Sequence, residues 1–423
     1  MNPTVLLIGT LDTKGPETAY LQERIEEQGC DTLVLDSGIL GDAVGIVPDI
    51  DRATVARAAG SDLETIRDSG SRGKAVERML EGVRSTVLEL YRSGRIHGVA
   101  ALGGAEGSVL AAAAMCALPV GIPKLLVSPI ASGRRVFAPF VGTRDVLVMH
   151  SVVDILGLSP MARGVFDNAA AAIAGMAKSY AAPKRATESR PHIAATMLGN
   201  TTQPLMRIRE QLDDRGIDLV LFHANGVGGT AMEEAIDRFE AILDYTLSEI
   251  AAEVAGGFHQ PPRPRMEVAA RARVPQVIVP SCVDFIIFGP RSEVPDRLQE
   301  RPSYYHNPEF TLVRVTKNEQ LEIARLLAKR LNAAQGKVEI LVPLRGLSIP
   351  NREGGEFYAP ETDAAFRAEL SSHLSPAITY SEIDAHVNDD DFADRVVEAL
   401  DRVVNLAEEE SDGPIAAKQR LPG

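Results

Sequence analysis

The sequence contains no tryptophan and only three cysteines, Cys30, Cys116 and Cys282, among its 423 residues. An odd number of widely separated cysteines fits neither a disulfide framework nor a thiolate zinc site, so we expect buried free thiols. No apolar run is long enough to cross a bilayer, and no basic stretch precedes an apolar run at the amino end. These absences predict a cytoplasmic protein without a membrane partner.

Basic residues are also fewer than acidic ones. The chain has 44 Lys and Arg and 58 Asp and Glu, which gives a net charge of −14. Such a surface repels phosphate backbones, so nucleic acid is not an expected partner. The remaining composition, with 45% hydrophobic and 24% charged residues, is typical of a folded soluble protein. The length allows two or three domains and a cleft between lobes.

Apolar runs alternate with helical patterns along the first half of the chain. Residues 5–9 form a continuous apolar run that ends in glycine, and a polar loop follows. Pro16 is placed to open a helix and Gly29 to stop it, after which residues 32–36 resume the strand pattern. The alternation continues to a helix over about residues 163–180. It predicts a parallel sheet with helices on both faces.

The second half begins like the first. Pro204 opens a helix 188 positions after Pro16, and Gly216 closes it 187 positions after Gly29. The pattern predicts an α/β fold of two doubly wound, Rossmann-like lobes with a cleft between them. Strands expected in the second sheet cover residues 192–198, 218–222, 276–279, 311–315, 338–342 and 378–383. The expected organisation is an N-terminal nucleotide-binding lobe over 1–182, a linker over 183–191, a C-terminal lobe over 192–407 and a flexible tail over 408–423.

Ligands of open parallel sheets bind beyond the carboxyl ends of the strands, where this chain has glycine-rich loops. The loop over residues 103–108 joins a strand directly to a helix, whose first amides and dipole favour phosphate. A tight turn without a ligand is the alternative. Lys14 and two threonines suit a phosphate chain, although the spacing is not that of a P-loop. Asp36 ends a strand where dinucleotide-binding folds place a ribose-binding acid, but a solvated aspartate is an equal alternative.

The C-terminal half offers His223 and Arg345 as catalytic candidates. His223 ends a strand before a glycine-rich turn, where a neutral imidazole can act as a general base, or it is a structural histidine. Arg345 follows another strand and suits a carboxylate or phosphate of a substrate, or it bonds a carbonyl at the lobe interface. Further candidates for the same cleft are Glu253, Asp284, His306 and His386. No spacing typical of a metal site is present, so we expect no dedicated zinc or iron centre.

Together these loops resemble Uncharacterised Protein Family 0261, also described as the ATP-binding domain family of the tomato mosaic virus resistance protein. The resemblance rests on GTLDTKG (9–15), DSG (36–38), GGAEGS (103–108), GTRDV (142–146), FHANGVGGTAMEE (222–234), HNP (306–308) and DAHVND (384–389). It implies two Rossmann-like subdomains, ATP with Mg²⁺ bound by the first, and a homodimer. The nucleotide would lie against Gly9, Thr10, Asp12, Thr13, Lys14, Asp36, Gly103, Gly104, Ala105, Glu106, Gly107, Ser128, Gly142 and Thr143.

The leading hypothesis is therefore a soluble ATP-binding protein, extended to an enzyme that uses ATP on a small anionic metabolite. One alternative is a non-catalytic, nucleotide-gated interaction protein, in which ATP only stabilises a binding surface. Another is a sugar-phosphate or small-molecule enzyme whose chemistry takes place in the C-terminal lobe. The sequence does not decide between an enzyme and a binding protein.

Overall fold

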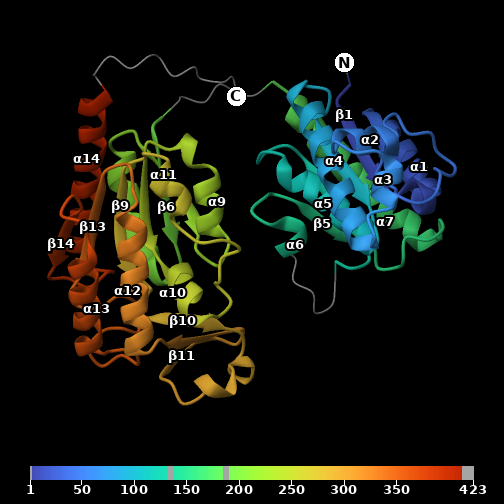
Figure 1. The fold of residues 1–423 in the computed structure, drawn as a ribbon. Coiled ribbons are helices and arrows are strands. Elements are labelled where there is room, and N and C mark those ends of the chain that lie inside the picture. The colour runs from blue at the N-terminus through green and yellow to red at the C-terminus, as the bar shows by residue number, and fades with distance from the viewer. Residues whose placement is uncertain (1, 132–137, 184–189, 412–423) are drawn as a thin grey trace. The chain divides into compact units, whose positions relative to one another are not determined.

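The structure is a computed structural model that describes residues 2–131, 138–183 and 190–411. The chain divides into two compact units, Met1–Ala186 and Thr187–Gly423, here called the N-terminal and C-terminal units (Figure 1). Residues 184–189 of the expected linker lie outside the described residues. Over the described residues there is no disulfide. Cys30 and Cys282 are buried as predicted, whereas Cys116 is only half-buried.

The N-terminal unit is built on a parallel sheet with the strand order β2-β1-β3-β4-β5. The first strand lies between the second and the third, so the chain changes its direction of travel across the sheet between β1 and β3. Such a switch point is where doubly wound sheets bind ligands. The strands are β1 (Thr4–Gly9), β2 (Asp31–Asp36), β3 (Gly98–Leu102), β4 (Lys124–Ser128) and β5 (Leu147–His150).

Helices cover both faces of this sheet because its strands are apolar on both sides. Val5 and Leu7 of β1 pack with α1 and α7, whereas Leu6 and Ile8 pack with α4 and α5. The predicted doubly wound lobe is therefore confirmed. The helices are α1 (Leu11–Glu27), α2 (Arg52–Ala58), α3 (Leu63–Arg67), α4 (Arg72–Arg92), α5 (Ala105–Ala117), α6 (Ala138–Val141) and α7 (Pro160–Ala181).

The start of α1 differs from the prediction of a polar loop that ends at Pro16. The helix begins at Leu11, and a break at Lys14 (φ −123°, ψ 16°) separates its first turn from the rest. Pro16 lacks an amide hydrogen and its ring crowds the preceding turn, which explains a bend at this point. Gly29 has φ 75° and follows the helix end, as predicted.

The C-terminal unit contains a parallel sheet with the strand order β14-β13-β9-β8-β6-β7. Its first strand, β6, again lies between the second and the third, which confirms that both lobes share one βαβ start. The strands are β6 (His192–Met197), β7 (Asp218–His223), β8 (Ala241–Thr246), β9 (Gln276–Ser281), β13 (Val338–Pro343) and β14 (Thr379–Ile383).

A second sheet of the C-terminal unit is antiparallel, with the order β10-β12-β11. Its strands are β10 (Phe285–Phe288), β11 (Ser303–Asn307) and β12 (Phe310–Arg314). The predicted strand over 311–315 corresponds to β12, so its assignment to the doubly wound sheet was wrong. An apolar run does not reveal which strand it will pair with, because pairing is decided by contacts distant in sequence.

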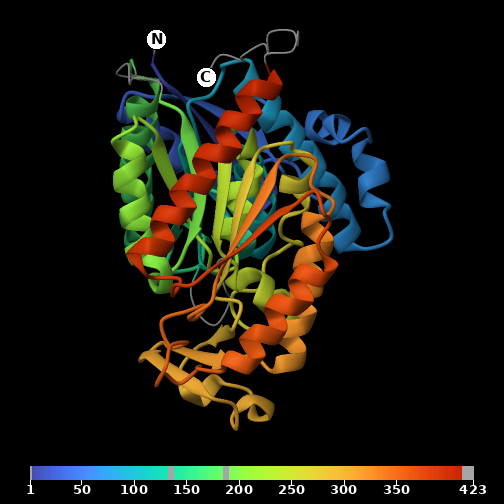
Figure 2. The same ribbon diagram turned by 90° about the vertical axis from the view of Figure 1, so that its left-hand side faces the viewer.

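Two helices, α8 (Thr202–Asp213) and α14 (Asp390–Ser411), share a core on one face of the large sheet, and Figure 2 shows α14 crossing that face. α14 continues past residue 407, where a tail was expected, and residues 412–423 lie outside the described part. No helix of the described residues is long and apolar enough to span a membrane. The remaining helices are α9 (Gly228–Glu234), α10 (Ser248–Ala255), α11 (Glu267–Arg271), α12 (Lys317–Leu331) and α13 (Pro360–His373), with short 3₁₀ turns at Gly199–Thr201, Ile236–Arg238, Arg291–Glu293 and Asp296–Leu298.

Candidate functional sites

The loops after β1 and β3 meet at the switch point of the N-terminal unit. An added Cβ on Gly107 would lie 3.9 Å from Thr10 Oγ1, so the two loops are in contact. Gly104 is the N-cap of α5 and offers no side chain to the first helical amides. These amides have no partner within their own helix. We call residues 9–15 and 103–108 together the phosphate edge.

Two adjacent glycines of the phosphate edge have different roles. A Cβ on Gly103 would lie 2.5 Å from the Ser108 nitrogen, so glycine is required there for the tight turn from β3 into α5. A Cβ on Gly104 would meet nothing within 4 Å. The space above Gly104 is open, so a bound group can approach the backbone there.

Lys14 and Asp12 belong to the segment of the phosphate edge that follows β1. Both side chains already have partners within the protein. Lys14 Nζ donates to the carbonyl oxygen of Ile155. Asp12 Oδ2 accepts a hydrogen bond of 3.1 Å from the Gly41 amide. An ammonium group has three donors and a carboxylate has several acceptor positions, so both retain capacity for a ligand. Thr10 and Thr13 place their hydroxyl oxygens 3.3 Å apart in the same loop.

The buried side chains of Asp36 and Ser128 form hydrogen bonds that hold the loops of the phosphate edge in position. The Asp36 side chain is buried, and its Oδ1 accepts from the amides of Leu11 and Gly38 at 3.2 and 2.8 Å. Burial raises the pKa of the Asp36 carboxyl. Ser128 is also buried, with its hydroxyl 2.7 Å from that of Ser108. Both residues hold the loops in place and present little surface to a ligand.

Gly142 and Thr143 are not brought to the phosphate edge. They precede β5, and the neighbouring Asp145 pairs with Lys124 at the first residue of β4. They therefore lie at the amino ends of the strands. The five residues of β4 alone separate the two edges by about 16 Å.

A cavity of about 580 Å³ opens beside the phosphate edge and is within the range of small-molecule sites. Glu106 of α5 lies at this cavity, where it accepts a hydrogen bond of 2.7 Å from Arg72 Nε. Apolar side chains, guanidinium groups and a carboxylate share the lining. The lining includes Ile39, Leu40, Arg67, Arg72, Ala75 and Glu106.

In the C-terminal unit, two cavities lie at the carboxyl edge of the large sheet and share Gly199 and Asn200, which follow β6. The first, of about 360 Å³, contains His223, His259 and His306, and we call it the histidine compartment. His223 and His306 were both predicted to face a cleft, and they do share this cavity. No group of side chains able to hold a metal ion is found among the described residues.

The histidines of this compartment differ in burial. His223 is exposed, whereas His259 is 8% exposed, with its Nδ1 3.4 Å from the Ser248 hydroxyl. Burial, together with the nearby His223, lowers the pKa of His259 to about 4. His259 is therefore neutral at pH 7. His259 was not selected from the sequence, because no recognisable motif surrounds it.

Arg345 lies outside both cavities. It forms two hydrogen bonds of 2.8 Å to Asp384, and both side chains are exposed. Arg345 follows β13 and His223 is the last residue of β7, and four inter-strand spacings, about 19 Å, separate these strands. The structure does not bring the two predicted catalytic residues together. Arg345 is paired with Asp384, a carboxylate of the protein itself, where we predicted that it would bind an anionic group of a substrate.

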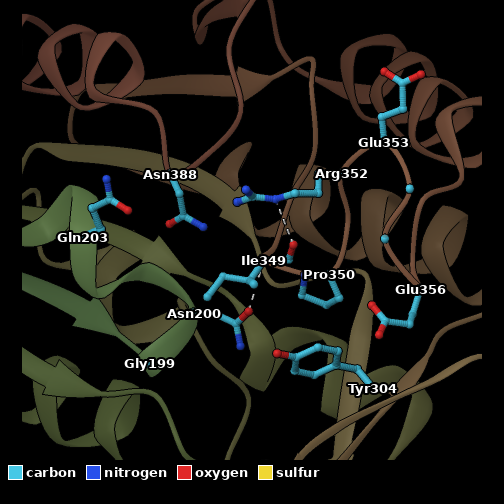
Figure 3. Close-up of a pocket in the computed structure, with 12 residues that line it drawn as sticks. Gly199, Asn200, Gln203, Tyr304, Ile349, Pro350, Arg352, Glu353, Glu356 and Asn388 are labelled. Atoms are coloured by element: carbon cyan, nitrogen blue, oxygen red, sulfur yellow. Dashed lines mark hydrogen bonds between the residues drawn. The ribbon is translucent and has the colours of Figure 1, made fainter.

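The second cavity, of about 460 Å³, is shown in Figure 3 and is here called the amide compartment. Its polar lining combines three side-chain amides with a guanidinium, two carboxylates and a phenol. These are Asn200, Gln203, Asn388, Arg352, Glu353, Glu356 and Tyr304. Arg352 belongs to the loop after β13, from which the sequence analysis selected only Arg345. Asn388 belongs to the DAHVND motif, but only its neighbour His386 was selected.

The glycine-rich turn after β7 surrounds a buried carboxylate of the protein itself. Glu249 Oε1 accepts from the amides of Gly226 and Gly229 at 2.9 and 3.3 Å. Arg265 is 0% exposed and contacts Glu233, Asp244 and Glu249 at 3.0, 2.8 and 2.6 Å. Burial raises the pKa of Glu233 and Glu249. The turn is therefore a structural element, and it positions His223 and Asn225 at its start.

The other predicted candidates of this unit are structural or buried. Glu253 pairs with Arg330 at 2.6 Å. Asp284 is fully buried, where it accepts from the Ser348 hydroxyl at 2.7 Å, and burial raises its pKa. His386 is buried beneath the amide compartment, with its Nε2 3.0 Å from the Ser348 carbonyl oxygen. None of the three lines either cavity.

Comparisons with known proteins support the two-unit division. The N-terminal domain model of Uncharacterised protein family UPF0261 matches residues 3–182, and the C-terminal domain model matches residues 190–404. A UPF0261 protein of Clostridium tetani is 37% identical over 96% of this chain and 100% of that protein. The ToMV resistance protein Tm-1(GCR237) of Solanum lycopersicum is 30% identical over 94% of this chain and 55% of that protein.

Among solved structures, the UDP-GlcNAc 2-epimerase of Methanocaldococcus jannaschii aligns over 95% of this chain and 99% of that chain, with 10% sequence identity and a TM-score of 0.21. A TM-score of this size is too low to support a conclusion about fold or function.

Proposed function

The chain belongs to Uncharacterised protein family UPF0261, and from this premise and the geometry of the switch point we propose that the N-terminal unit binds ATP at its phosphate edge. The observation that carries the proposal is the meeting of the β1 and β3 loops over the uncapped start of α5. Backbone amides and the helix dipole at such a position favour phosphate. The adjoining cavity of about 580 Å³ would hold the nucleoside.

Four residues of the phosphate edge have a part in this proposal. The amides of Ala105 and Glu106 would donate to phosphate oxygens, and Lys14 would add a positive charge. Mg²⁺ prefers carboxylate oxygens and usually binds with one or two of them plus the substrate phosphates. We propose that Asp12 takes this role for the Mg²⁺ that accompanies ATP.

Replacing Gly104 with valine is expected to weaken ATP binding at least tenfold, a loss of about 1.4 kcal/mol. The valine side chain would occupy the open space above the α5 amides, where an added Cβ meets no protein atom within 4 Å. The melting temperature should therefore stay close to that of the wild type. Titration calorimetry with ATP and Mg²⁺ measures the affinity.

Gly103→Val is the matched control for this experiment. Its Cβ would lie 2.5 Å from the Ser108 nitrogen, so it should destabilise the fold itself. Normal ATP affinity in a folded Gly104→Val variant would contradict the proposal, whereas a loss of stability equal to that of Gly103→Val would assign Gly104 a structural role.

Lys14→Ala is expected to weaken ATP binding more than AMP binding. A point charge acts most strongly on the triphosphate, which carries more negative charge than the monophosphate. The same substitution also removes the hydrogen bond to Ile155. Calorimetry with both nucleotides separates the two effects, because losing only the loop contact would weaken ATP and AMP equally.

A further inference from the structure

Asn388 is a buried polar side chain without a partner at the wall of the amide compartment. It is 7% exposed, and neither its Oδ1 nor its Nδ2 forms a hydrogen bond. Each such atom costs about 1–3 kcal/mol when it is buried without a partner. Figure 3 shows the amide directed into the cavity, between Gln203 and Arg352. Asn388 therefore faces the place where a ligand would supply the missing bonds.

The backbone around Asn388 is held firmly, and burial restricts the motion of its side chain before any ligand arrives. The Asn388 amide nitrogen donates to His386 Nδ1 at 3.1 Å, and His386 Nε2 lies 3.0 Å from the Ser348 carbonyl oxygen. Tyr245 donates from its hydroxyl to the Val387 carbonyl at 2.5 Å. A fixed side chain loses little entropy on binding, which favours affinity.

Arg352 and Asn200 extend the polar surface around Asn388. Arg352 uses only its Nε, which donates to the Ile349 carbonyl oxygen at 3.2 Å. Asn200 Oδ1 accepts from the Ile349 amide at 3.2 Å and fixes this loop on the end of β6. Within the described residues, no protein acceptor is paired with the terminal guanidinium nitrogens of Arg352 or with Asn200 Nδ2. These groups remain available to a ligand.

The lining also limits the charge of that ligand. One guanidinium and the carboxylates of Glu353 and Glu356 give the compartment a net charge of −1. A triphosphate would be repelled, but a single anionic group can pair with Arg352. Side-chain amides both donate and accept, and hydroxyl groups do the same. Amides and carboxylates therefore match a molecule with several hydroxyl groups.

We propose that the amide compartment binds a small polyhydroxylated molecule, a sugar or a sugar acid, with at most one negative charge. The site is lined by residues of the C-terminal unit alone, whereas the proposed ATP site belongs to the N-terminal unit. Asn388 and Asn200 bind hydroxyl groups, and Arg352 binds the carboxylate of a sugar acid or a further hydroxyl.

The test uses the full chain with neutral hexoses and pentoses and their monocarboxylic sugar acids, such as D-glucose and D-gluconate. We expect at least one of these probes to raise the melting temperature and to bind in titration calorimetry. Asn388→Ala should weaken that binding about tenfold through two lost hydrogen bonds. Arg352→Gln should weaken the binding of a sugar acid more than that of a neutral sugar. The affinity for ATP should not change in either variant.

Stability of the unliganded protein separates a ligand role of Asn388 from a structural one. Asn388→Ala removes no hydrogen bond of its side chain, so its melting temperature should equal or exceed that of the wild type. Asn351→Ala is the matched control, since Asn351 is also buried but its Nδ2 donates to Asp363 at 2.9 Å. It should lower the melting temperature.

Three results would overturn the proposal. The first is the absence of binding by every probe. The second is binding of a probe that is unaffected by Asn388→Ala and Arg352→Gln. The third is a melting temperature lowered as much by Asn388→Ala as by Asn351→Ala, which would show that the Asn388 amide has a structural partner.

Discussion

Replacing Arg265 with methionine is expected to lower the free energy of unfolding of the C-terminal unit by about 3–5 kcal/mol. Arg265 is the only cation among the residues that contact Glu233, Asp244 and Glu249 in the described structure, and all four side chains are buried. Methionine would fill much of the same volume but leave three carboxylates without their counter-ion. Loss of one member of a buried ion group is costly for this reason.

Urea denaturation followed by circular dichroism measures this effect, since the chain has no tryptophan for fluorescence. Arg215→Met is the control, because Arg215 pairs with Asp401 at the surface, where both side chains are at least 40% exposed. An exposed pair contributes about 0–1 kcal/mol. If Arg265→Met cost no more than Arg215→Met, the buried cluster would not hold the glycine-rich turn.

A second large effect is expected from pH, through His259. Its pKa is lowered from 6.5 to about 4 by burial and by His223, so the folded state resists protonation that the unfolded chain accepts. The stability contributed by neutral His259 is fully present above pH 6.5. It is lost as the pH falls towards 4, where the loss reaches about 3 kcal/mol.

Denaturation at pH 7 and at pH 4.5 measures this contribution as a difference between variants. His259→Gln cannot titrate, so its stability should fall less over this interval than that of the wild type. His373→Gln is the control, since it removes a histidine that is exposed on α13. An identical fall for wild type and His259→Gln would show that His259 titrates normally in the folded protein.

Much of the fold was predictable because its signals are local. Gly29 and Gly216 take φ of 75° and 71° after the first helix of each unit, so the stop signals were correct in both lobes. The strand over 311–315 was correctly identified as a strand, but its sheet was wrong. The identity of its partners, β10 and β11, depends on contacts that no local pattern contains.

The parts of the candidate sites that could be predicted are the loops that directly follow a parallel strand. Residues 9–15 and 103–108 were placed together because parallel strands bring their carboxyl ends to one edge. Gly142 was misplaced because the loop that contains it precedes its strand, at the other edge. The amide compartment escaped prediction because Asn200, Arg352 and Asn388 come from three distant loops. Only the folded chain reveals that Asn388 has no partner.

The most direct test of the account is a crystal structure of the full chain with Mg²⁺ and a non-hydrolysable ATP analogue. We expect phosphate oxygens roughly 2.7–3.2 Å from the amide nitrogens of Ala105 and Glu106, with Lys14 directed towards the phosphates. Mg²⁺ should lie beside Asp12. A nucleotide bound elsewhere, with its phosphates against Arg352 or at the opposite edge near Gly142, would contradict the proposal that the β1/β3 switch point is the ATP site.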